Sequence, residues 1–197
     1  MRELGVLAFV TVDGVMQSPS APGEDPSGGF TEGGWAAPYW DGVMPHVERT
    51  AMASPYDILF GRKTYDIFAG HWPNAPKSDV ADLLNSARKY VATARGDALT
   101  WENSRALADD VVSAVQRLKS EDGPRLQIHG SAALIQTLLA TDLIDVFQIW
   151  TFPVVVGAGK RLFEAGVTPR RYALQSVEAL EIGVVHQVLR RAEGNAP

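Results

Sequence analysis

Short apolar segments of strand length alternate with amphipathic segments of helix length along this chain. The first, residues 4–12, has the sequence LGVLAFVTV and is apolar at almost every position. Such a run is typical of a strand that is covered on both faces, as in a mostly parallel sheet. The other segments with strand character are residues 56–60, 89–93, 125–129, 145–156, 172–179 and 184–191.

Helix character appears between these strands. Ser78 is a good N-cap before the segment DVADLLNSA, and residues 107–118 form an apolar helical face that starts at Leu107. A short turn at Gly183 joins the last two strands. The sequence therefore predicts an α/β sandwich with a parallel sheet and an antiparallel edge. The other expected helices cover residues 43–53, 62–68 and 131–140.

Composition limits the class of protein. The chain has 197 residues, of which 46% are hydrophobic, and a formal net charge of −5. This size and balance predict one folded domain over residues 1–197. The sequence has no cysteine, which excludes disulfides and thiolate metal sites. We expect no metal, no nucleic-acid partner, no membrane span and no signal peptide, and therefore a cytoplasmic protein.

One long segment, residues 17–42, is rich in residues that break regular structure. It holds ten glycines and prolines together with four aromatic residues. A disordered linker would rarely carry so many aromatic side chains, so we expect the segment to pack on the domain. Loops of this length are often lids over a binding site. The alternative is a surface insertion held in place by its own aromatic side chains.

Three strand ends carry groups that suit an anionic ligand. In an open α/β sheet, ligands bind beyond the carboxyl ends of the strands. One strand runs into Gly61-Arg62-Lys63-Thr64 before a helix, the next ends in Thr93-Ala94-Arg95, and another ends in Gly130-Ser131-Ala132. Glycines and helix N-termini offer backbone N–H groups to phosphates, and arginine binds them in two-pronged fashion. Together the three turns fit a dinucleotide, although each alone often serves chain geometry only.

The order of several motifs resembles the dihydrofolate reductase superfamily. The segments are TVDGVMQ, LFGRKTYDIF, HWP, VATAR, IHGSAALIQTLL and PVVVGAGKRLF. They look most like the branch of the C-terminal reductase domain of RibD, the bifunctional deaminase–reductase of riboflavin biosynthesis. The resemblance covers residues 3–191. It implies a three-layer αβα sandwich with a central mixed, mostly parallel sheet of about eight strands, ending in an antiparallel β-hairpin.

The resemblance also implies NADPH as hydride donor. In the family, the two glycine-containing turns hold the pyrophosphate, which corresponds here to Gly61–Thr64, with Lys63 inside that turn, and to Gly130, Ser131 and Ala132. The segment with Thr93 and Arg95 would meet the 2′-phosphate of the adenosine. The turn of Asp13 and Gly14 would lie near the nicotinamide, and the loop over residues 17–42 would cover the substrate.

The proton donor and the substrate contacts stay open at this stage. Asp13 and Asp41 are the candidate proton donors, with solvent as a rival, but each could instead cap its own turn or helix. Trp35, Tyr39 and Trp40 would stack on a planar substrate or merely anchor the loop. Neither Asp41 nor Glu48 matches by spacing the pterin-binding acid of dihydrofolate reductase, so folate reduction is not indicated.

The sequence thus predicts an NADPH-dependent reductase of a small heterocyclic or carbonyl compound, related to 5-amino-6-(5-phosphoribosylamino)uracil reductase or to dihydrofolate reductase. One alternative is a nucleotide- or pterin-binding module that has lost catalysis. The other is a homo-oligomeric scaffold, in which the apolar strand over residues 147–156 serves as an interface. The resemblance also implies a homodimer.

Overall fold

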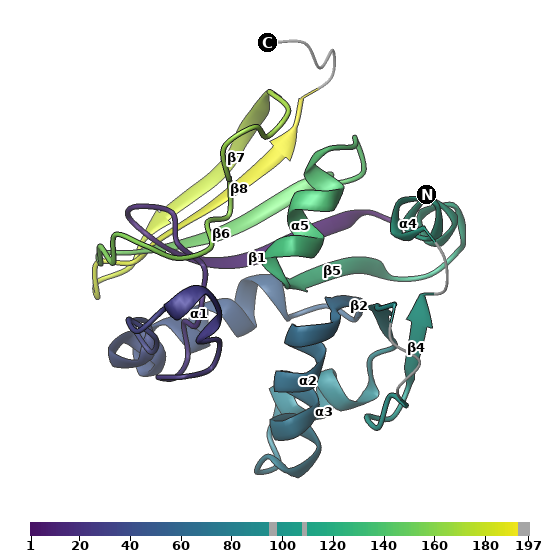
Figure 1. Ribbon diagram of the computed structural model, residues 1–197, viewed down its shortest axis with the longest axis horizontal. Coiled ribbons are helices and arrows are strands. Elements are labelled where there is room, and N and C mark those ends of the chain that lie inside the picture. The colour runs from purple at the N-terminus through teal and green to yellow at the C-terminus, as the bar shows by residue number, and fades with distance from the viewer. Residues whose placement is uncertain (95–97, 108–109, 193–197) are drawn as a thin grey trace.

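A computed structural model describes residues 1–94, 98–107 and 110–192. These residues form an eight-stranded sheet in the order β4-β3-β2-β5-β1-β6-β8-β7 (Figure 1). Neighbouring strands from β4 to β6 run parallel, and β8 is antiparallel to both β6 and β7. The strands are β1 (Leu4–Thr11), β2 (Tyr56–Gly61), β3 (Lys89–Ala92), β4 (Ser104–Leu107), β5 (Arg125–Gly130), β6 (Val146–Phe152), β7 (Tyr172–Ala179) and β8 (Val185–Arg191).

Helices cover both faces of the sheet, as the predicted sandwich requires (Figure 1). Apolar side chains of α4 and α5 pack on one face, against alternate residues of β1 and β5. On the other face, α1 packs over β1 and β6, while α2 and α3 pack over β2 and β3. These helices are α1 (Trp40–Ala51), α2 (Arg62–His71), α3 (Asp79–Ser86), α4 (Val111–Ser120) and α5 (Ala132–Leu139).

Local signals at several element ends are confirmed. The hydroxyl of Ser78 accepts a hydrogen bond from the backbone of Ala81 and caps α3. Gly183 lies in the turn between β7 and β8 with a φ of 83°, a conformation that favours glycine. In the described part of the chain, no helix has the length and apolarity to cross a membrane.

Three sequence-based boundaries are wrong. Leu107 ends β4 and does not begin a helix, because its side chain completes the core beside β3. Residues 40–42 belong to α1 and not to the long loop. The strand expected over residues 145–156 ends at Phe152, because Pro153 has no N–H to donate to a neighbouring strand.

The strand considered as an interface with another chain, β6, is an inner strand of the sheet. β6 lies between β1 and β8, and Phe147, Trp150 and Phe152 each have 0% exposure. These side chains fill the core, so they are not available as a surface for another chain. The structure therefore does not support residues 147–152 as the interface that was the alternative over residues 147–156, whereas Val155, beyond the strand, is 69% exposed.

Candidate functional site

Two of the predicted phosphate-binding turns interlock at the sheet edge. β2 and β5 are neighbours, so Gly61 and Gly130 end side by side. A Cβ added to Gly61 would lie 2.1 Å from Oγ of Ser131 and 2.9 Å from its Cβ. A Cβ on Gly130, whose φ is 129°, would lie 2.8 Å from Oγ1 of Thr64. The two turns thus approach each other so closely that a side chain at either glycine would not fit.

The same turns bring two helix N-termini together. α2 begins after Gly61, and α5 begins after Ser131, whose hydroxyl accepts a hydrogen bond from the backbone of Leu134. The first N–H groups of a helix have no partner inside the helix and carry partial positive charge. Lys63 adds a full charge in the first turn of α2. This geometry suits the phosphates of a nucleotide.

A central cavity of about 250 Å³ lies against these turns. Its walls include Lys63, Thr64 and residues 130–133, together with residues 7–9 of β1 and residues 16–20 after it. It therefore joins the predicted phosphate turns to the end of β1, where the resemblance places the nicotinamide.

An edge cavity of about 450 Å³ continues from the other side of Ser131. It is lined by Gly61, Arg62, residues 92–94 and the first turns of α4 and α5, and it shares Ser131 and Ala133 with the central cavity. Thr93, expected near the adenosine, lies in this lining. Arg95, the other residue expected there, falls outside the described residues.

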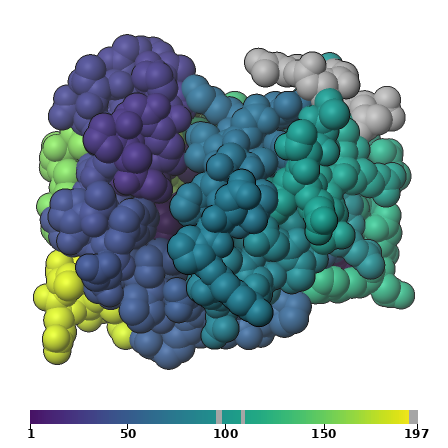
Figure 2. Space-filling view, turned by 90° about the horizontal axis from the view of Figure 1, so that it is seen from below, coloured from purple at the N-terminus to yellow at the C-terminus, as the bar shows by residue number. Residues whose placement is uncertain are grey.

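An apolar cavity of about 770 Å³ opens between α1 on one side and α2 and α3 on the other. Figure 2 shows the hollow between the purple and indigo N-terminal segment and the teal helices. It shares Leu7, Phe9, Glu24, Phe68 and His129 with the central cavity, among others. The three cavities therefore form one continuous cleft along the carboxyl ends of the strands.

His129 stands where the central and apolar cavities meet. Its ring lies 5.8 Å from the ring of Phe68, and Nε2 of Gln127 lies 3.2 Å from its Nε2. Desolvation, together with the charge of Arg125, lowers the pKa of His129 to about 3, so the ring is neutral at pH 7. The sequence alone assigns no role to this histidine. Its position directly before Gly130, at a strand end, was the available signal.

The loop that begins at Gln17 is fastened over the cleft. The Gln17 amide donates to the carbonyls of Asp25 and Ser27, while its oxygen accepts from the backbone of Lys160. The carboxylate of Asp25 binds Nζ of Lys160 at 2.6 Å and also binds Nζ of Lys63. These hydrogen bonds from the two lysines hold the pKa of Asp25 well below its ordinary value, against the opposing effect of burial. The loop thus contacts both walls of the central cavity.

Neutralising Asp25 tests this fastening. We expect Asp25→Asn to speed proteolytic cleavage within residues 18–36 by about tenfold, because both lysine ion pairs are lost while the rest of the loop stays anchored. Limited proteolysis followed by mass spectrometry measures this rate. Glu32→Gln is the matched control, since Glu32 is exposed and bonds only its neighbour Thr31. Equal cleavage of both variants would contradict the role of Asp25.

The aromatic residues of the loop divide between anchoring and lining. Trp35 is 7% exposed, donates from its indole to the carbonyl of Gln17, and packs 5.4 Å from Phe152. Tyr39 also packs on Phe152, at 5.6 Å. Of the three candidate substrate contacts, only Trp40 lines the apolar cavity. Trp35 and Tyr39 hold the loop to the sheet.

The two candidate proton donors lie outside the cavity linings. Asp13 accepts from the hydroxyl of Thr11 and from the backbones of Val156 and Gly157, and the Thr11 bond chiefly lowers its pKa. Gly14, with a φ of 82°, completes the same turn. Through Asp13, this turn is hydrogen-bonded to the loop that contains Val156 and Gly157. Asp41 is exposed in the first turn of α1 and makes no cap.

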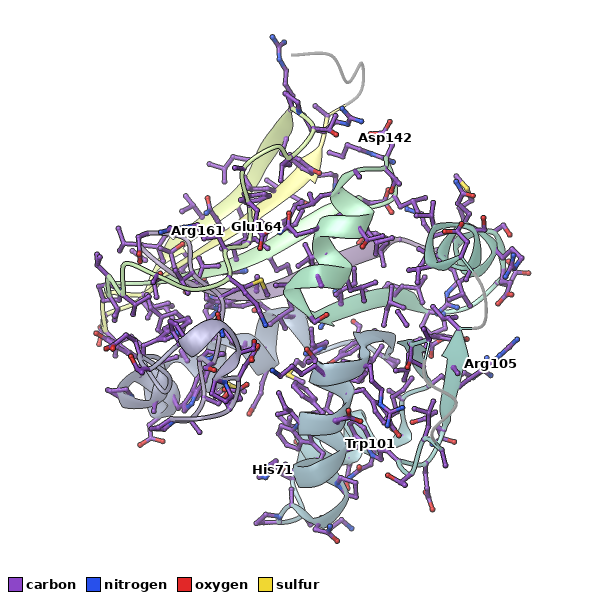
Figure 3. The ribbon with its side chains drawn as sticks, in the orientation of Figure 1. His71, Trp101, Arg105, Asp142, Arg161 and Glu164 are labelled. Atoms are coloured by element: carbon purple, nitrogen blue, oxygen red, sulfur yellow. The ribbon has the colours of Figure 1, made fainter. Side chains whose placement is uncertain are left out.

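Figure 3 shows how α2 separates two environments. His71 lies at the end of α2 and lines the apolar cavity. Trp101 lies on the side of α2 toward β4, where its backbone binds the hydroxyl of Tyr65. The side of α2 with His71 faces the cleft, and the side that contacts Trp101 belongs to the core.

Sequence comparison assigns the family. The family model of the RibD C-terminal domain matches residues 3–186. The chain belongs to the RibD C-terminal domain family, a reductase family of the riboflavin-pathway type. Two relatives from Bacillus subtilis (strain 168) are uncharacterised. YyaP is 30% identical over 140 residues, which cover 68% of this chain and 74% of YyaP. YwjB is 31% identical over 106 residues, which cover 54% of this chain and 57% of YwjB.

Two solved structures have the same fold. A candidate riboflavin biosynthesis protein from Shewanella sp. PV-4 superposes with a TM-score of 0.68 at 18% identity, covering 97% of this chain and 99% of the other. A pyrimidine reductase-like protein from Corynebacterium diphtheriae NCTC gives 0.62 at 10% identity, covering 98% and 92%. At these identities the likeness establishes the α/β sandwich alone.

Proposed function

We propose that this RibD C-terminal domain protein is an NADPH-dependent reductase of a small heterocyclic or carbonyl compound. The observation that carries the proposal is the continuous cleft, in which two helix N-termini converge beside an apolar cavity. Gly61 at the end of β2, with Lys63 and Thr64 of α2, would hold the pyrophosphate together with Ser131 and Ala132 at the start of α5. Arg62 and Thr93 line the edge cavity, where the adenosine would lie. When bound, NADPH supplies the hydride.

The chain's own residues position the substrate and exclude water. The loop fastened by Asp25 covers the central cavity, and Trp40 with Phe68 walls the apolar one. Excluding water strengthens electrostatic contacts at the reacting atoms. Because His129 is neutral at pH 7, it serves as a hydrogen-bond donor and not as an acid. With Asp13 and Asp41 outside the linings, we assign proton delivery to solvent that reaches the cleft mouth.

Cofactor binding is the direct test. We expect NADPH to raise the melting temperature much more than NADH at the same concentration. A ligand at about 100 times its Kd adds about 2.7 kcal/mol of stability. Replacing Arg95 with alanine should remove most of the NADPH effect and little of the NADH effect, because the guanidinium is expected to bind the 2′-phosphate. No shift with either cofactor at millimolar concentration would overturn the proposal.

One observation favours a binding module without catalysis as the second candidate. The cleft side of α1 presents Trp40, Met44 and Val47, whereas its acids Asp41 and Glu48 are exposed. No carboxylate of α1 is therefore placed to bind and protonate a pterin-like ring. Oxidation of NADPH by panels of carbonyl and heterocyclic compounds separates the two candidates. Binding without turnover on either panel would favour the module.

The proposed assembly is a homodimer formed through β7. This strand is the sheet edge, and Leu174 and Val177 on it are 58% and 60% exposed. An exposed edge with apolar side chains is suited to pairing with another strand. Sedimentation equilibrium should give twice the mass of one chain, and Val177→Lys should give the mass of one chain. A wild-type monomer at micromolar concentration would contradict this assembly.

A further inference from the structure

The walls of the apolar cavity define the kind of molecule that fits it. Four aromatic rings line it, from Phe9, Trp40, Phe68 and Trp72, with aliphatic side chains of α1 and α3 between them. Phe9 lies at 5.0 Å from Trp40, and Phe68 lies at 6.3 Å from Trp72. Two aromatic pairs on opposite walls favour a planar ring system between them.

The charged groups of this cavity exclude a phosphate ester. Among the described residues that line it, none is lysine or arginine, and the one carboxylate is that of Glu24. Glu24 accepts hydrogen bonds from the backbones of Ser20 and Ala21. The nearest lysines of the cleft, Lys63 and Lys160, are bound to Asp25 in the central cavity. A phosphate in the apolar cavity would face a carboxylate and lose its water without gaining a cation.

His129 supplies the polar contact for a ligand in this cavity. With the amide nitrogen of Gln127 donating to its Nε2, the neutral ring carries its proton on Nδ1. The ring lines both the apolar and the central cavity. The ring therefore lies at the junction where a reducible group would meet the cofactor.

We propose that the apolar cavity binds an uncharged, planar aromatic compound with a hydrogen-bond acceptor, an oxygen or ring nitrogen, for Nδ1–H of His129. A phosphorylated pyrimidine would then not be the substrate. This inference rests on the proposed function for its assignment of the cavity as the substrate site. It concerns ligand chemistry alone and is testable without cofactor.

Two probes that differ only in a phosphate group test whether the apolar cavity prefers an uncharged ligand. Quenching of tryptophan fluorescence in the full chain measures binding of 2-naphthol and of 2-naphthyl phosphate, since Trp40 and Trp72 line the cavity. We expect the Kd of 2-naphthol to be at least tenfold lower. Met44→Lys places a cation in the lining and should reduce this preference to less than threefold. Equal or tighter binding of the phosphate by the wild type, or no binding of either probe, would overturn the proposal. So would an unchanged preference in the variant.

A second pair of variants tests His129. His129→Leu removes the donor, and we expect it to raise the Kd of 2-naphthaldehyde about tenfold while leaving naphthalene unchanged. His129→Gln retains a donor and should stay within threefold of the wild type. Unchanged naphthalene binding also shows that the variant cavity is intact. Loss of both probes in equal measure in His129→Leu would overturn the role of this donor.

Failure of the inference is distinguishable from failure of the proposed function. If NADPH causes no thermal shift but 2-naphthol is still preferred over its phosphate, the reductase assignment fails and the ligand class stands. If NADPH binds and the phosphate is preferred, the reductase assignment stands and the ligand class fails.

Discussion

Replacing Gly61 with alanine is expected to weaken NADPH binding at least 100-fold. The added Cβ would lie 2.1 Å from Oγ of Ser131, 2.9 Å from its Cβ and 3.1 Å from its backbone nitrogen. Rotating the Ser131 hydroxyl relieves only the first of these contacts, so the start of α5 has to move away from α2. The two helix N-termini then no longer converge on one pyrophosphate. Forcing extra atoms into a packed site typically costs about 1–3 kcal/mol of stability.

Gly70→Ala is the matched control for this substitution. Gly70 lies in the same helix, and a Cβ there would meet nothing within 4 Å. Alanine in a helix is favoured over glycine by about 0.5–1 kcal/mol, so this variant should be slightly more stable and bind NADPH normally. Calorimetric titration and thermal melts of both variants measure the two effects. Tight NADPH binding by a folded Gly61→Ala protein would contradict the interlocked turns as the phosphate site.

The convergence of these turns could be predicted only in part from the sequence. Gly61 and Gly130 could be identified because each follows an apolar run and precedes a helical segment. Parallel strands place such ends at one edge of the sheet. That β2 and β5 are neighbours is a property of strand order, which the pattern does not contain. The resemblance to a known fold implied the sandwich and its final hairpin but not that order, so the contact between Gly61 and Ser131 appears only in the structure.

The residues that sequence reasoning missed depend on contacts between distant segments. Asp25 binds Lys160 across 135 positions, and no local pattern marks such a pair. His129 lies in the segment IHGSAALIQTLL, but the segment alone does not show its role, which comes from the two cavities that meet beside it. β4 is four residues long, with Arg105 and Ala106 exposed, so its apolar pattern is too short to identify a strand. Asp13 was a candidate proton donor because the resemblance places its turn near the nicotinamide. In the structure, its carboxylate accepts hydrogen bonds from Thr11 and from the backbones of Val156 and Gly157.

A pair of buried histidines, His46 of α1 and His186 of β8, leads to the second prediction with a large expected effect, which concerns the stability of the fold in acid. The ring of His186 on β8 stacks on Trp150 at 4.1 Å and lies 4.9 Å from the ring of His46. Its Nε2 is buried and makes no hydrogen bond to the described residues. His46 in turn binds Glu178 of β7 at 3.0 Å and accepts from the indole of Trp150. Desolvation, and next the charge of His46, lower the pKa of His186 to about 4.

Mild acid should therefore destabilise the fold. An unfolded histidine has a pKa of about 6.5, so between pH 6.5 and 4 the unfolded chain binds more protons than the folded one. The free energy of unfolding then falls as pH falls through this window. For His186 the loss at pH 5 relative to pH 7 is about 2 kcal/mol. His129, with its pKa lowered to about 3, contributes with the same sign.

His186→Phe isolates this contribution, because phenylalanine keeps the stack on Trp150 and has no proton to bind. Urea denaturation at pH 7 and pH 5 should show a loss about 2 kcal/mol smaller in this variant than in the wild type. His71→Asn, at an exposed position, should keep the wild-type loss. The carboxylates with lowered pKa values, such as Asp25 and Glu178, lose their contribution only as pH falls below about 4.5, so they do not affect the comparison. An identical loss in His186→Phe and the wild type would mean that folding does not lower the pKa of His186.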